Sequence, residues 1–164
     1  MFKNHKSKLY NILLTLSRNI FFYKKIALPD TFETRIYLMF IHFSILMIIF
    51  KKKGKKFDQK SYDYFFNNIE YNLRELGFGD VTVNKKMKEF NKILYDILLK
   101  LNIEKDTNAK FNLNHSLITK YFDSLNDVNS SQFIQFKTYF YDFFHFCFDQ
   151  PLENMIEELK KFKF

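Results

Sequence analysis

The sequence predicts an all-α fold in which residues 1–164 form one domain of about six to seven helices around a very apolar central helix. Only 3 Gly and 2 Pro leave little material for the turns of a many-stranded sheet. Apolar residues recur at helical spacing along most of the chain. From residue 36 to residue 50 the only polar side chains are Tyr37, His42 and Ser44, so this helix is apolar on every face.

Local signals place both ends of the central helix. Asp30 can cap the helix, and Glu33 stands three residues on, where a capping-box carboxylate reaches back to an open backbone N–H. We therefore expect the helix to begin at about Thr31. The lysine-rich segment Lys51–Lys56 stops it, with Gly54 available for the C-terminal turn.

An apolar helix must be surrounded by protein or by lipid. A membrane-spanning helix needs about 20 consecutive apolar residues. The run from 36 to 50 is shorter, and Glu33 and Arg35 lie one turn before it. We therefore expect a buried central helix, and a membrane span over residues 32–50 is the alternative.

The segment before the central helix predicts an amphipathic first helix over residues 6–23. Its basic and then apolar start superficially resembles a signal peptide, but no small-residue cleavage site follows. Leu9, Leu13 and Leu16 fall on one face of a helix instead.

Two more helices follow the central one. Asp58 can cap the first, and Gly77 closes it. Residues 77–84 read as a shaped turn, and they lack the Gly-Lys-Ser/Thr end of a phosphate loop. The second helix is expected over residues 84–101, with three lysines at its start. Positive charge there opposes the helix dipole, which indicates an acidic partner.

The remainder of the chain predicts C-terminal helices, residues 113–164, after a polar loop. The loop covers residues 102–112. Helical patterns follow near 114–125, over 132–149 and over 152–162.

Positive charge is concentrated in the first third of the chain. Residues 1–60 carry 13 Lys and Arg but 3 Asp and Glu, a net charge of +10, within an overall +8. Two lysine groups are either solvated helix ends or a surface for anionic lipid or nucleic acid phosphate. Their members are Lys51, Lys52, Lys53, Lys55, Lys56, Lys85, Lys86 and Lys88.

The residues indicate no catalytic or metal chemistry. Cys147 is the sole cysteine, so no intrachain disulfide forms, and its neighbours are typical of a core thiol. His145 and Cys147 are two apart, a spacing that points side chains away from each other on a helix. His42 is expected to be a hydrogen-bonded core histidine, with a haem-ligand role as the alternative. We expect a non-enzymatic protein without a cofactor.

One ordered set of residues closely resembles the ubiquinol-cytochrome c chaperone family, the assembly factors of respiratory complex III. The resemblance covers about residues 8–101. The residues that carry it are Leu9-Tyr10, Arg18, Pro29-Asp30-Thr31, Arg35, His42, Leu73-Arg74-Glu75, Gly77-Phe78-Gly79-Asp80, Val83 and Lys86-Met87-Lys88. The chain departs from the family at Tyr95-Asp96-Ile97, where Tyr-Gly-Arg is common.

The resemblance implies an all-helical chaperone that binds newly made cytochrome b and helps it reach complex III. It also implies a small partner protein and the ribosome as further partners, and any haem contact would come through cytochrome b. Since the chain begins almost at the domain, we expect a bacterial version that works in the cytoplasm against the inner membrane. A basic helical module that binds RNA or a membrane surface is the rival function.

Within this resemblance, one polar group is the expected binding surface for cytochrome b or a partner. Its residues are Asp30, Thr31, Arg35, His42, Arg74, Glu75 and Asp80. Arg35 and His42 lie seven apart, about two turns along one helix face. We expect the other charged residues to pair with them across helices. The alternative is a buried ion-pair network that only holds the helices together.

Overall fold

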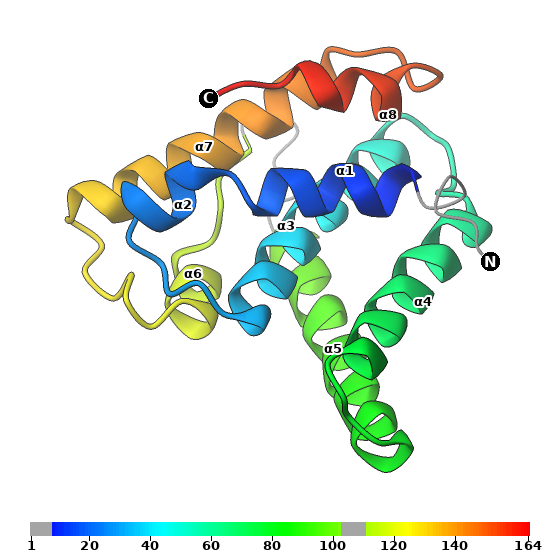
Figure 1. Ribbon diagram of the computed structural model, residues 1–164. Helices are drawn as coiled ribbons and strands as arrows, with labels where there is room; N and C mark the ends of the chain where they lie inside the picture. Colours follow the sequence, from blue (N-terminus) through cyan, green and yellow to red (C-terminus); the bar gives the residue numbers. More distant parts are fainter. Residues whose placement is uncertain (1–7, 103–110) are drawn as a thin grey trace.

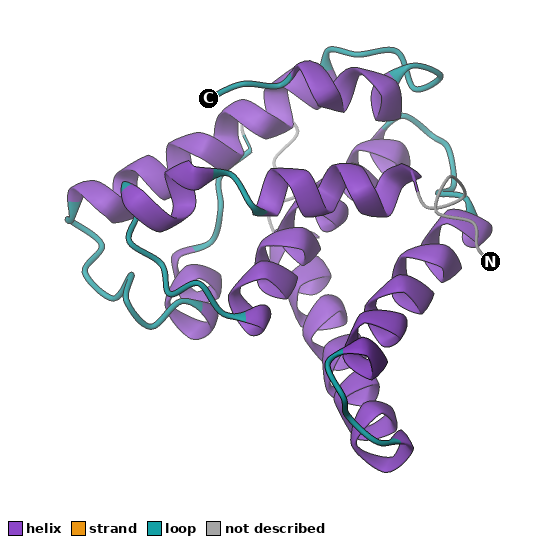
Figure 2. Ribbon diagram, viewed as in Figure 1, coloured by secondary structure: helices purple, strands orange, loops and turns teal. Residues whose placement is uncertain are grey.

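The computed structural model describes residues 8–102 and 111–164, and all regular structure in these ranges is helical (Figure 1, Figure 2). This confirms the predicted all-α class. The helices are α1 (Lys8–Ser17), α2 (Ile20–Lys24), α3 (Phe32–Lys52), α4 (Gln59–Glu75), α5 (Asp80–Asn102), α6 (His115–Tyr121), α7 (Ser131–Phe148), α8 (Met155–Glu158) and the 3₁₀ turn η2 (Leu159–Lys161). Most of the predicted 102–112 loop lies outside the described residues.

Helix α3 begins and ends close to the predicted positions. Thr31 is its N-cap, and the Thr31 hydroxyl accepts a hydrogen bond from the Thr34 backbone N–H at 3.1 Å. The predicted cap, Asp30, is wrong by one residue, because its carboxylate accepts a charge-assisted hydrogen bond from Arg35 instead. At the other end Gly54 adopts a positive φ of 78°, as expected of a residue that ends a helix.

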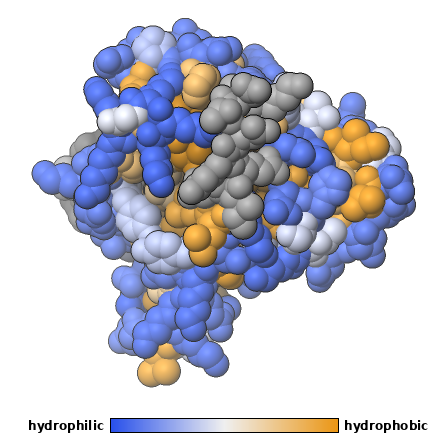
Figure 3. Space-filling model, turned by 180° about the vertical axis from the view of Figure 1, so that it is seen from behind, coloured by the Kyte–Doolittle hydropathy of each residue, from blue (hydrophilic) through white to orange (hydrophobic). Residues whose placement is uncertain are grey.

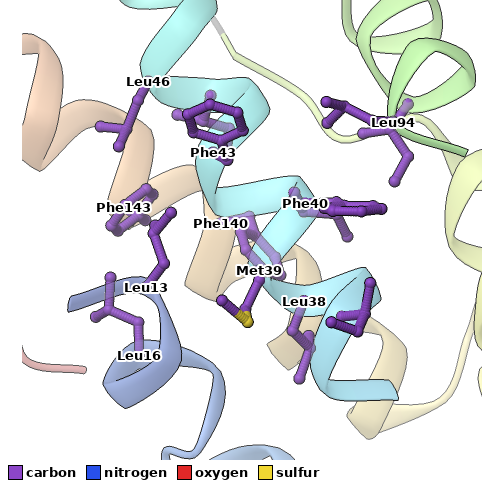
Figure 4. Packing of buried hydrophobic residues seen from close by; sticks show 14 of the residues in the cluster. Leu13, Leu16, Leu38, Met39, Phe40, Phe43, Leu46, Leu94, Phe140 and Phe143 are labelled. Atoms are coloured by element: carbon purple, nitrogen blue, oxygen red, sulfur yellow. The ribbon is translucent and has the colours of Figure 1, made fainter. Parts of the chain in front are cut away.

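Protein surrounds α3. Helices α1, α5 and α7 pack against it from different sides (Figure 1). Full burial of one Leu or Phe side chain contributes about 1.5–3 kcal/mol, so this layer is the main source of stability. Side chains that meet there include Leu13 and Leu16 of α1, Met39, Phe40 and Phe43 of α3, Leu94 of α5, and Phe140 and Phe143 of α7 (Figure 4).

In the part of the chain that is described, α3 is the one helix long and apolar enough to cross a membrane. A core helix of a soluble protein has the same length and composition. The structure buries 72% of the most apolar window of α3. Helix α3 is therefore the buried central helix that the sequence predicts.

Two polar side chains, His42 and Ser44, lie inside this apolar layer. His42 has a partner on each side of its ring: Nδ1 is 2.7 Å from the Leu38 carbonyl oxygen and Nε2 is 2.8 Å from the Tyr139 hydroxyl. A carbonyl can only accept, so Nδ1–H donates to Leu38 and the Tyr139 hydroxyl donates to Nε2. The link joins the middle of α3 to α7.

Helices α4 and α5 form a hairpin that projects from the rest of the molecule (Figure 1). Asp58 caps α4 as predicted, accepting from the Ser61 backbone N–H at 3.2 Å, and Gly77 closes it with φ of 96°. Helix α5 begins at Asp80, four residues before the predicted Asn84. A carboxylate in the first turn complements the helix dipole, which favours this earlier start.

The first predicted helix is two helices. Helix α1 ends at Ser17, and α2 starts at Ile20 after a break at Arg18 and Asn19. The Asn19 side chain accepts from the Phe21 backbone N–H at 3.0 Å, so it caps a new helix in place of continuing the old one. The break turns the chain so that Phe21 and Phe22 pack against Tyr139 of α7.

The C-terminal helices are shorter than predicted except for α7. Ser130 caps α7, and its hydroxyl accepts from the Phe133 backbone N–H at 3.1 Å. The predicted helix over 152–162 is only α8 and η2. Residues just after Pro151 form a turn, and regular helix starts at Met155, where Met155 and Leu159 anchor one face in the core.

Replacing Tyr139 by Phe should lower the free energy of unfolding by about 1–3 kcal/mol. The substitution leaves the ring in place but removes the donor to His42 Nε2, which stays buried without a partner. Urea denaturation measures the change. Tyr141→Phe, on the exposed side of the same helix, is the control, and equal losses in the two variants would contradict the role of the buried hydrogen bond.

Candidate functional site

A groove of about 430 Å³ lies between α1, the start of α3 and the end of α4. We call it the α1–α3–α4 groove. Its wall combines charged, amide and aromatic side chains with a few apolar ones. The lining residues are Tyr10, Asn11, Leu14, Arg18, Phe32, Arg35, Ile36, Met39, Asn68, Tyr71, Asn72, Glu75 and Leu76. Two residues of the predicted binding group, Arg35 and Glu75, are among them.

The position of Arg35 in this groove is fixed by Asp30, five residues earlier in the chain. Its Nη2 and Nε donate to the same Asp30 oxygen at 2.6 and 3.0 Å. The two side chains are 35% and 58% exposed. An ion pair this exposed contributes between about 0 and 1 kcal/mol to stability, so it orients Arg35 more than it stabilises the fold. The alternative of a buried ion-pair network is wrong for this pair.

The other predicted members do not form one network with Arg35. Arg74 pairs with Asp80 across the turn between α4 and α5, away from the groove. Both charged pairs join residues close in the sequence, since a neighbour five or six residues away is already within reach. Glu75 makes no ion pair within residues 8–102 and 111–164, and the predicted pairing across helices is therefore wrong.

His42 lies inside the core and not on this surface. Burial lowers its pKa to about 4, although the hydrogen bond to the Leu38 carbonyl opposes the shift. The imidazole is therefore neutral at pH 7. Since both ring nitrogens are already bonded to protein groups, His42 is the predicted core histidine, and a haem iron could bind it only after displacement of Tyr139 or Leu38.

The structure adds residues that the predicted binding group lacked. The Asn72 amide donates to the Tyr10 hydroxyl and joins α4 to α1, and both residues line the groove. Burial raises the pKa of Tyr10, so its hydroxyl stays neutral. Arg18 and Tyr71 also line the groove. Tyr10 and Arg18 are among the residues that carry the family resemblance, and this was the only sequence signal that could have placed them in the binding group.

The first lysine group ends α3. Lys51, Lys52, Lys55 and Lys56 are exposed. Lys53 differs, because its ammonium donates to the Gln150 carbonyl at 2.7 Å and lies 5.1 Å from the Phe148 ring centroid. Lys53 thus ties the end of α3 to the end of α7, and four lysines of this group are left for a partner.

The second lysine group lies on α5, but not at its start. Because α5 begins at Asp80, Lys85 is in its second turn and Lys88 in its third. The prediction that these lysines oppose the dipole at the start of the helix is therefore wrong. Lys86 leans toward the turn, with its ammonium 5.1 Å from the Phe78 ring centroid.

A second hollow, of about 880 Å³, lies between α1 and the C-terminal end of the chain. Ile12 and Leu16 form one wall and Leu159 and Phe162 the other. It contains none of the predicted binding residues. Asn11 on α1 borders both hollows, so this short helix separates them.

Cys147 is buried in the core, and burial raises the pKa of its thiol far above the usual range although Lys53 opposes the shift. A protonated, enclosed thiol is a poor nucleophile. Among the residues that the structure describes, no three His, Cys, Asp or Glu side chains gather as metal ligands would.

A sequence model of the family Ubiquinol-cytochrome C chaperone matches residues 24–157. The chain belongs to this family. The match extends past the 8–101 segment that carried the resemblance and takes in α6 and α7, while α1 lies outside it. No curated protein and no solved structure matches the chain.

The departure from this chaperone family at Asp96 has a structural role here. Partial burial opposes its ionisation, but hydrogen bonds from Tyr121, Lys120 and Lys100 outweigh that effect and lower its pKa to about 2. Lys120 Nζ is 2.9 Å and Lys100 Nζ 3.4 Å from the carboxylate. Asp96 thus joins α5 to α6 in this chaperone.

The buried neutral His42 predicts a pH-dependent stability for this chaperone. Its folded pKa, about 4, lies below the ordinary 6.5, so the unfolded chain binds the proton first. The stabilising contribution is complete above pH 6.5 and is lost as the pH falls toward 4. Between pH 7 and pH 5 the free energy of unfolding should decrease by about 2 kcal/mol from this group.

Urea denaturation at the two pH values of wild type, His42→Gln and His115→Gln checks this. In His42→Gln the decrease in the free energy of unfolding between pH 7 and pH 5 should be about 2 kcal/mol smaller than in wild type. His115 is exposed at the start of α6, so His115→Gln is the matched control and should show the pH dependence of wild type. An unchanged slope in His42→Gln would refute the prediction.

The Cys147 thiol should react with a disulfide reagent such as dithiobisnitrobenzoate only when the chaperone opens. We expect native protein to react at least about 100-fold more slowly than protein in 6 M guanidinium, because the thiol is enclosed and protonated. Absorbance at 412 nm measures the rate. Fast labelling of the native protein would show that Cys147 is accessible.

Proposed function

We propose that the protein is an assembly chaperone of ubiquinol-cytochrome c reductase, complex III, which binds newly made cytochrome b and promotes its incorporation. Membership of the Ubiquinol-cytochrome C chaperone family supports the class of function. The observation that supports the choice of binding site is the α1–α3–α4 groove, which Arg35 and Glu75 line together with aromatic side chains.

The chemistry of this groove suits the end of an apolar segment. Tyr71, which is exposed, and Phe32 offer aromatic area, while Arg18, Arg35 and Glu75 offer charge of both signs. A volume of about 430 Å³ holds a few side chains but not a whole membrane-spanning helix. We therefore infer that the groove takes the junction where an apolar helix of cytochrome b meets its charged loop.

The setting that we propose is the cytoplasmic face of a bacterial inner membrane. There the exposed lysines at the end of α3 would meet lipid phosphates, the ribosome or a small partner protein. Each phosphate contact makes binding weaker at high salt. In this proposal the protein performs no reaction and needs no cofactor, and any haem belongs to cytochrome b.

Arg35→Leu should reduce recovery of cytochrome b about tenfold while changing the free energy of unfolding by less than about 1 kcal/mol. The variant removes one of the two guanidinium groups that line the groove, and the Asp30 pair that it breaks is too exposed to matter for stability. The measurement is affinity purification of tagged protein from a respiring host after mild crosslinking, with mass spectrometry of the recovered proteins.

Arg74→Leu is the matched control, because it breaks another exposed Arg–Asp pair outside the groove. Cytochrome b should be recovered with this variant as with wild type. Equal loss in both variants would place binding elsewhere than the groove. Recovery of RNA or unrelated soluble proteins alone from wild type would overturn cytochrome b as the client.

A further inference from the structure

One face of α5 points away from the protein along its whole length. The buried side of this helix is marked by Val83, Phe90, Leu94 and Ile97. On the opposite side, residues recur at alternating steps of four and three, which keeps them on one line of a helix. We call this line the α5 outer face. It consists of Val81, Lys85, Lys88, Lys92, Tyr95 and Leu99.

The α5 outer face exposes apolar side chains at both ends. Val81 is 83% exposed, and Leu99 and Tyr95 are 66% and 59% exposed. Val81 and Leu99 are 18 residues apart, which is about 27 Å along a helix. Seen from behind, the projecting end of the molecule is hydrophilic along its length and hydrophobic at its extremity (Figure 3).

Three lysines lie between these apolar ends. Lys85, Lys88 and Lys92 form no ion pair with any residue that the structure describes. Like charges three and four residues apart destabilise a helix. This arrangement therefore points to a binding partner outside the chain.

Acidic residues are absent from the line itself. Glu89 lies to one side, where its charge acts on Tyr37 of α3. Asp96 lies beside the line and is already bound by Tyr121, Lys120 and Lys100. The face therefore presents a net positive charge between apolar ends.

We propose that the α5 outer face docks on the surface of a lipid bilayer rich in anionic lipid. Amphipathic helices bind such surfaces by burying apolar side chains at the headgroup boundary while lysines contact lipid phosphates. Val81 and Leu99 enter the interface, and Lys85, Lys88 and Lys92 lie over the headgroups. The length and straightness of the line suit a flat surface.

This inference rests on the proposed function for its biological setting, because cytochrome b is apolar and is inserted into a membrane. A chaperone docked through α5 holds its groove, which lies between α1, α3 and α4, at a fixed height above the lipid. Docking itself requires only the purified protein and vesicles, so the two proposals can be tested separately.

The test is sedimentation of purified full-length protein with vesicles of 30% phosphatidylglycerol in phosphatidylcholine. We expect binding at 50 mM salt, little binding at 500 mM salt, and little to pure phosphatidylcholine. Lys85→Gln/Lys88→Gln/Lys92→Gln should weaken binding about 100-fold, because each lysine near an anionic surface contributes about fivefold. Val81→Ser/Leu99→Ser should weaken it about tenfold.

Lys24→Gln/Lys25→Gln/Lys163→Gln is the control for net charge, and Ile134→Ser on α7 is the control for an exposed apolar residue. Both should bind as wild type does, and all variants should melt normally by circular dichroism. Equal weakening in the lysine variant and its control would overturn the proposal. So would failure of wild type to sediment, or stronger binding to an RNA oligonucleotide than to vesicles.

Recovery of cytochrome b from a detergent lysate separates the two proposals. If the protein recovers cytochrome b but does not bind vesicles, only the docking surface is wrong. If it binds vesicles through α5 but never recovers cytochrome b, the docking surface holds and the proposed function fails.

Discussion

The structure depends on one constraint: α3 has no polar face, so it needs cover on every side. Helices α1, α5 and α7 supply most of that cover, and Phe65 of α4 packs on Phe40 and Phe43. The constraint also fixes chemistry in the core. His42 can be enclosed because Tyr139 and the Leu38 carbonyl occupy both ring nitrogens, and its pKa is low because nothing there would solvate a charge.

Local signals were sufficient to predict most of the helices. Asp58 caps α4, Ser130 caps α7 and Gly77 ends α4, because each of these residues acts through bonds to backbone groups within a few positions. The apolar run of α3 predicts burial for a similar reason, since composition alone excludes an exposed position. Such features depend little on how distant segments fold.

Features that depend on competition or on tertiary contacts were predicted poorly. The Asp30 carboxylate could accept from a backbone N–H at the start of α3 or from a guanidinium, and it accepts from Arg35. Asp80 similarly paired with Arg74 nearby, so the predicted binding group did not form an ion-pair network across helices. The groove joins Arg18 and Glu75, which are far apart in the sequence, and periodicity within one helix cannot reveal such a meeting.

The turn between α4 and α5 has a consequence for how this protein can change over evolution. Every residue from Arg74 to Thr82 is exposed, so the packing of the core does not depend on the hairpin tip. Paired insertions or deletions of whole helical turns should therefore alter the reach of the hairpin without cost to the core. The interior thus sets no limit on the length of the hairpin, whereas the groove residue Glu75 and the tip residues that carry the family resemblance do.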